Sequence, residues 1–168
     1  MKKRIFCLVI SIFTAVALVG CGKTDELDEY YEAVNTFNEE VSTIAGNMNE
    51  LDGEDISQSG VLLQELDSLE EQFRVLSEVD VPDAFASNET LADEAYAYMQ
   101  EAVGGFHEYY ENNEADYATF EIAKENYDRA FLRIEYISTI LQGEIPEGDN
   151  IEVIEEESTD FDPVTADE

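Results

Sequence analysis

The sequence predicts an all-α fold: an antiparallel up-down-up-down four-helix bundle, preceded by a signal helix and followed by a disordered acidic tail. Three observations support this prediction. Apolar residues between positions 24 and 142 recur at alternating spacings of three and four, as in the seam of a packed helix. Four such runs are separated by short polar or glycine- and proline-containing segments, which favour antiparallel neighbours. No run alternates with the period of two that is typical of a strand.

The first two runs predict one helix that begins at Thr24 or Asp25 and a second that begins at Asp55 or Ser57. Pro82 closes the second helix, because the residue before a proline is pushed out of helical geometry. The expected seam positions are Leu27, Tyr30, Val34, Phe37, Val41, Ile44, Met48 and Leu51 in the first run and Leu62, Leu66, Leu69, Phe73 and Leu76 in the second.

The third run predicts a helix that begins between Pro82 and Ser87 and ends at Asn112, and the fourth predicts a helix that ends before Gly143 and Pro146. The expected seam positions are Leu91, Ala95, Tyr98, Ala102, Gly105 and Tyr109 in the third run and Phe120, Ala123, Tyr127, Ala130, Ile134, Ile137 and Leu141 in the fourth. A two-helix hairpin that dimerises is the alternative architecture. Four matched segments in one chain favour the single-chain bundle over residues 24–142.

Residues 143–168 form an acidic tail that we expect to be disordered. They contain eleven Asp and Glu, no Lys or Arg, and two of the three prolines. Such a segment buries too little apolar surface to offset the entropy lost on ordering. An alternative is that the short apolar cluster at 151–154 adds to a partner as an extended strand.

The first 23 residues have the composition of an export signal. Lys2, Lys3 and Arg4 precede an apolar run over residues 5–19, which is shorter than the roughly 20 residues of a transmembrane helix. The run ends in Leu18-Val19-Gly20-Cys21, an aliphatic residue and small residues followed by cysteine. This order resembles the signal and lipobox of bacterial lipoproteins. An ordinary secretory signal and a retained membrane anchor are the alternatives.

The resemblance implies that residues 1–20 are removed and that Cys21 receives a diacylglyceryl group, with residues 21–23 as anchor and short linker. Two acyl chains hold a protein on a bilayer where one does not, since each buried methylene contributes about 0.8 kcal/mol. It further implies an extracytoplasmic location on a bacterial cell membrane, in the manner of small helical-bundle lipoproteins of Gram-positive organisms. Cleavage would also remove Cys7 and leave no second cysteine for an internal disulfide.

Charge and residue types exclude several function classes. The 168-residue chain has 41 Asp and Glu against 8 Lys and Arg, a net charge of -33, which argues against direct nucleic-acid binding. His107 is the only histidine, and we expect it on the surface, with no metal site and no cofactor. Residues 52–57 lack the spacing of a calcium-binding loop, so cations are expected to be attracted only diffusely. No catalytic constellation is visible, and we do not expect an enzyme.

The third predicted helix is rich in tyrosine and contains an adjacent glycine pair, Gly104 and Gly105, which costs about 1 kcal/mol per residue relative to alanine. One interpretation is a notch that admits a bulky residue from a facing helix. The other is a kink or groove that binds a peptide or an aromatic ligand. The candidate groove residues are Tyr96, Tyr98, Met99, Phe106, Tyr109 and Tyr110.

Two functions remain from these observations. The first is a helical interaction module, anchored at the membrane through Cys21, that contacts an envelope or secretion protein or peptide. Its acidic surface would suit a basic partner. The second is a small-ligand or cation receptor that uses the tyrosine-rich third helix.

Overall fold

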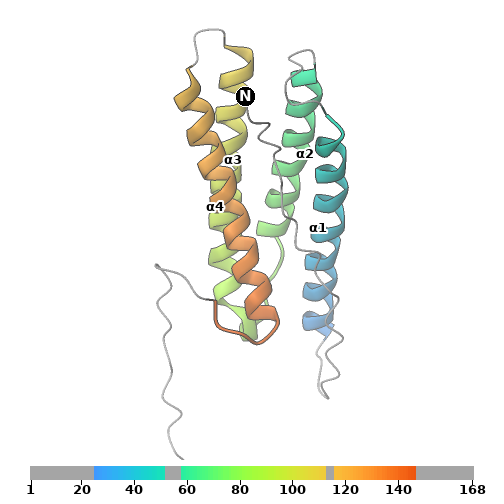
Figure 1. Cartoon of the computed structure of the whole chain (residues 1–168). Coiled ribbons are helices and arrows are strands. Elements are labelled where there is room, and N and C mark those ends of the chain that lie inside the picture. The colour runs from blue at the N-terminus through green and yellow to red at the C-terminus, as the bar shows by residue number, and fades with distance from the viewer. Residues whose placement is uncertain (1–24, 52–57, 113–115, 147–168) are drawn as a thin grey trace, which may run out of the picture.

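The computed structural model describes residues 25–51, 58–112 and 116–146, and these residues fold into four long helices packed together, with no strand among them (Figure 1). The predicted all-α class is therefore confirmed. The expected signal helix, the calcium-loop candidate and nearly all of the acidic tail lie outside the described residues. The helices are α1 (Asp25–Asn49), α2 (Ser59–Ser77), α3 (Ser87–Glu111) and α4 (Tyr117–Leu141), with a short 3-10 helix, η2 (Asp83–Phe85), before α3.

The helix ends follow the local signals in the sequence. α3 begins at Ser87 and ends before Asn112, both as predicted. α4 ends at Leu141, and Gly143 follows with a positive φ of 77°, a conformation that costs glycine little. α2 is shorter than the other helices, with 19 residues against 25, and it stops at Ser77 rather than continuing to Pro82. η2 then leads the chain into α3.

The bundle interior is an apolar core built mainly from the predicted seams of α1, α2 and α4, although the expected seam positions Leu27, Met48, Leu51 and Phe120 are only partly buried. A row of aromatic rings crosses it, because Phe73 of α2 makes edge-to-face contacts with Phe37 of α1 at 5.2 Å and with Phe131 of α4 at 5.3 Å between ring centroids. Tyr127 continues the row at 4.8 Å from Phe131. Each such pair adds about 0.5–1.5 kcal/mol beyond the area it buries. At the start of α2, Leu63 is buried in place of the expected Leu62, which is only partly buried.

The buried face of α3 differs from the predicted seam. Tyr98 and Tyr109 were expected in the core, but both are only partly buried. The predicted Ala95 and Ala102 are buried, and the other buried positions of α3 are Asn88, Ala92, Met99, Val103 and Phe106. The physical reason is the close approach of α4, which leaves room for alanine at the centre of the interface and places the larger tyrosine rings at its margins.

Gly105 marks that close approach. A Cβ placed on Gly105 would lie 2.8 Å from the Cβ of Ala123 on α4, whereas a Cβ on Gly104 would meet nothing within 4 Å. The notch interpretation of the glycine pair is thus correct for Gly105 in that it admits a facing helix. The admitted residue is a small alanine, not a bulky side chain.

A buried polar pair joins α1 to the start of α3. Asn88 has no exposed surface, and its Nδ2 donates a 3.1 Å hydrogen bond to the hydroxyl of Tyr30. The Oδ1 of Asn88 has no hydrogen-bond partner among the described residues. Burial raises the pKa of the Tyr30 hydroxyl, whose ring also contacts Phe85 of η2 at 6.1 Å. This pair ties the first helix to the turn that precedes the third.

Candidate functional site

Two of the six candidate groove residues lie in the protein core. Met99 has no exposed surface and Phe106 has 4%. Their positions on α3 turn them toward the other helices and away from solvent. Neither side chain is available to an external ligand in this arrangement.

Tyr98 faces the basic residues of α4. The guanidinium carbons of Arg129 and Arg133 lie 5.7 and 5.4 Å from the centroid of its ring, within the range of a cation–π contact. Arg133 also donates from Nε to Glu94 of α3 at 2.6 Å. The face of Tyr98 is therefore used by internal contacts between α3 and α4.

Tyr109 and Tyr110 belong to an aromatic cluster where α3 ends and α4 begins. Their rings pack edge to face at 5.1 Å, and Phe120 of α4 lies 5.2 Å from Tyr109 and 6.5 Å from Tyr110. Tyr117 stacks on Phe120 at 5.6 Å and keeps 58% of its surface exposed. Burial raises the pKa of the Tyr110 hydroxyl. The cluster holds the α3–α4 pair together at this end.

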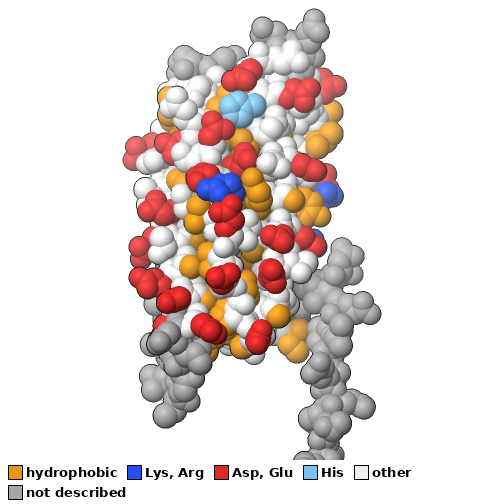
Figure 2. Space-filling view, turned by 180° about the vertical axis from the view of Figure 1, so that it is seen from behind, with side chains coloured by type: hydrophobic (Ala, Val, Ile, Leu, Met, Phe, Trp, Pro, Cys, Tyr) orange, Lys and Arg blue, Asp and Glu red, His pale blue; other side chains and the backbone are white. Residues whose placement is uncertain are grey.

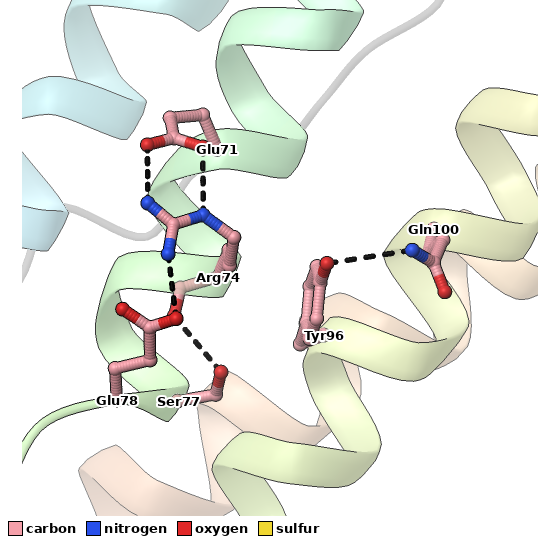
Figure 3. Close-up of polar contacts among 6 residues, drawn as sticks. All are labelled: Glu71, Arg74, Ser77, Glu78, Tyr96 and Gln100. Atoms are coloured by element: carbon pink, nitrogen blue, oxygen red, sulfur yellow. Dashed lines mark hydrogen bonds and ion pairs between the residues drawn. The ribbon is translucent and has the colours of Figure 1, made fainter.

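Tyr96 lies on another side of α3, the one that faces α2. Its hydroxyl accepts a 3.4 Å hydrogen bond from Gln100 one turn away. Tyr96 lies across from Arg74, which is held between Glu71 of α2 and Glu78 just after that helix (Figure 3). The six candidates thus separate into the core, the α4 side, the aromatic end and the α2 side. The structure does not bring them together into one groove.

His107 connects α3 to α2. Its Nε2 lies 2.8 Å from Oδ1 of Asp67 on α2, and its Nδ1 lies 3.3 Å from Oε1 of Glu111 one turn along α3. The hydrogen bond to Asp67 raises the pKa of the imidazole, and Glu111 adds to the effect. On the same side of α2, partial burial together with the charge of Asp67 raises the pKa of the Glu70 carboxyl. The single histidine therefore joins two helices, and its contacts with Asp67 and Glu111 stabilise the charged form of the imidazole.

A groove between α1 and α2 is the feature that sequence reasoning missed. It has a volume of about 230 Å³. Its lining residues are Glu29, Glu32, Ala33, Thr36 and Phe37 of α1 and Gln72, Val75 and Leu76 of α2, with Val79 just beyond that helix. The signal available in the sequence was Val75, an apolar residue next to the α2 seam that remains 46% exposed.

The surface around these features is dominated by carboxylates. Figure 2 shows Asp and Glu side chains spread over the whole face, with Lys and Arg at few points. Within the described ranges, no group of three or more His, Cys, Asp or Glu is arranged to hold a metal ion. None of the described helices combines the length and the apolar character needed to cross a membrane.

No known protein family, curated protein or solved structure matches the chain.

Proposed function

We propose that the chain is a lipoprotein anchored through Cys21 on the extracytoplasmic face of a bacterial membrane, where its helical bundle docks a basic envelope or secretion partner. The observation that carries the proposal is the order of features at the start of the sequence: three positive residues, an apolar run of limited length, and Leu18-Val19-Gly20-Cys21. Removal of residues 1–20 would leave five basic residues against all 41 acids. An anchored body of this charge attracts basic surfaces.

Internal pairing of the cations supports the docking half of the proposal. Each of the four Lys and Arg residues in the described ranges is matched to a carboxylate. The pairs are Arg74 with Glu71 and Glu78, Lys124 with Asp128, Arg129 with Glu125, and Arg133 with Glu94. Basic groups from a partner would therefore meet acids that have no Lys or Arg of their own nearby, while acidic partners would be repelled.

We further propose the up-down-up-down arrangement for the bundle, and contacts between helix ends support it. Asn47, near the end of α1, donates to Glu65, near the start of α2, at 3.1 Å. Tyr110 and Phe120 likewise join the end of α3 to the start of α4. In such a bundle the chain enters α1 and leaves α4 at the same end. The start of α1 would then lie at one end of the bundle and the start of α4 about 37 Å away, at 1.5 Å per residue over the 25 residues of α4.

The anchoring half is tested by metabolic labelling with an alkyne fatty acid in a bacterial host. The expected result is incorporation into the wild type and into Cys7→Ser, and none into Cys21→Ser. Cys7→Ser is the matched control because it also removes one thiol, but from the apolar run that cleavage would discard. Equal labelling of the Cys21→Ser variant would refute the proposed anchor.

The docking half is tested by in-cell crosslinking of the anchored protein, followed by purification and mass spectrometry. A reproducible basic protein from the envelope is expected with the wild type. The same product should disappear with Cys21→Ser, since the variant no longer remains at the membrane. Recovery of lipid and bulk cell-wall material alone would contradict a stable protein partner.

A further inference from the structure

We propose that the groove between α1 and α2 is a docking site for a basic amphipathic segment of a protein partner. The segment would place an apolar side chain in the groove and Lys or Arg side chains beside Glu29 and Glu32. This inference rests on the proposed function and specifies the partner surface that it requires.

The groove has an apolar floor and an open top. Phe37 and Leu76 form the floor, and each has 4% of its surface exposed, while Val75 on the wall keeps 46%. Ala33 and Thr36 line the α1 side with small side chains, which is why α1 leaves the space unfilled. An apolar cavity of about 150 Å³ accommodates benzene, so the 230 Å³ here has room for a leucine- or phenylalanine-sized group.

Acidic residues border the groove on its α1 side. Glu29 and Glu32 are three residues apart and therefore lie on the same face of α1. No Lys or Arg is among the lining residues. Arg74 on α2 is already bound by Glu71 and Glu78, at 2.6 Å in each case. The border thus presents net negative charge to anything that enters.

The negative charge at the groove indicates which kind of molecule can bind there. A second copy of the chain carries a net charge of -33, and both an anionic lipid surface and the chain's own acidic tail would also be repelled. A basic amphipathic helix satisfies both parts of the site, because residues three and four apart share a face and can present one apolar side chain flanked by cations. Its Lys or Arg stems would also cover the apolar wall while their charged ends reach the carboxylates.

The test is a fluorescence-anisotropy titration of the purified whole chain with a labelled 18-residue Leu/Lys peptide of amphipathic helical pattern. A Leu/Glu peptide of the same pattern and a Leu/Lys peptide of scrambled order are the controls. The amphipathic basic peptide is expected to bind most tightly, the scrambled basic peptide more weakly through charge attraction alone, and the Leu/Glu peptide not at all. Ala33→Leu, which fills the groove, should weaken binding of the amphipathic basic peptide by about tenfold. Circular dichroism verifies that each variant keeps its helix content.

Two matched pairs of variants separate docking in the groove from general charge attraction. Val75→Ser should weaken binding and Val61→Ser should not, although both valines are 46% exposed on α2. E29Q/E32Q should weaken binding several-fold, whereas E39Q/E40Q removes the same charge from α1 outside the groove and should have a smaller effect.

Equal losses within both pairs would overturn the groove assignment, as would full binding by Ala33→Leu with its helix content intact. If Ala33→Leu fails to fold, the valine pair decides the outcome. The titration contains no membrane, so a failed Cys21 anchor leaves its result unchanged. Conversely, normal labelling at Cys21 without peptide binding would refute the groove while leaving the anchor in place.

Discussion

Alanine substitutions at the two adjacent glycines of α3 are expected to shift stability in opposite directions. Both glycines lie inside a continuous helix, where alanine is favoured over glycine by about 1 kcal/mol. A Cβ on Gly104 meets nothing within 4 Å, so Gly104→Ala should keep this full gain. A Cβ on Gly105 would lie 2.8 Å from Ala123 Cβ, which is attached directly to the α4 backbone and cannot rotate away.

The cost at Gly105 follows from this contact. Relief requires α3 and α4 to separate by several tenths of an ångström along their most closely packed region, and overpacking of this kind costs about 1–3 kcal/mol. Set against the helical gain, Gly105→Ala should destabilise the protein by about 0–2 kcal/mol. The two variants should therefore differ by about 1–3 kcal/mol, or on the order of 4 °C in melting temperature for each kcal/mol.

Thermal and urea unfolding followed by far-UV circular dichroism measures this difference, with the wild type as reference. Combining Gly105→Ala with Ala123→Gly should recover part of the loss, since the second change restores the space for a Cβ. A melting temperature for Gly105→Ala equal to or above that of Gly104→Ala would refute the close approach of α3 and α4. So would a double variant that shows strictly additive losses.

Three further predictions use the same unfolding assays. Tyr30→Phe should destabilise the protein by about 1–3 kcal/mol, because it leaves the buried Asn88 amide without a hydrogen-bond partner. Tyr30→Phe combined with Asn88→Leu should recover much of this loss. Equal stability of the wild type and Tyr30→Phe would contradict the hydrogen bond between Tyr30 and Asn88. The pKa of His107 is raised from its usual 6.5 in the folded state, so its contact with Asp67 should stabilise fully below pH 6.5 and lose this effect as pH rises through the raised value. His107→Gln should remove that part of the pH dependence, about 0.5 kcal/mol for a partly exposed pair, and an unchanged pH profile would argue against it. Asp116→Ala should cost about 1 kcal/mol because Oδ1 of Asp116 accepts a 3.2 Å hydrogen bond from a first-turn amide of α4; Asp116→Asn, which can still cap, serves as its control.

The seam of α1 was predictable because none of its large apolar residues is exposed. The spacing of three and four also marked the seam of α4, although Ile122 and Leu132 outside that seam are 61% and 38% exposed. The prediction for α3 was less accurate, since that helix carries both alanines and tyrosines on adjacent stripes. The spacing of three and four placed Tyr98 and Tyr109 on the seam together with Ala95 and Ala102, and the two alanines are indeed buried. Only the approach of α4 shows that Tyr98 lies at the margin, against Arg129.

The candidate groove illustrates the same limit. Five aromatic residues and Met99 of one helix were grouped because they are close in sequence. The side chains of a helix, however, point in all directions around its axis. Met99 and Phe106 therefore face the core, while Tyr96 faces α2. The described residues instead form a groove between α1 and α2, and its acidic border comes from residues that the sequence gives no reason to group with Val75.

By itself, the sequence determined the all-α class, both ends of α3, the C-terminal end of α4, the acidic charge and the expectation of a lipid anchor, because each depends mainly on residues close together along the chain. The tertiary structure alone decided which residues meet across helices. Asp67 and His107 are 40 positions apart, and Tyr30 and Asn88 are 58 apart. These contacts depend on the rotation of each helix about its axis and on its distance from the neighbouring helices. Both are determined by the packing of many side chains together.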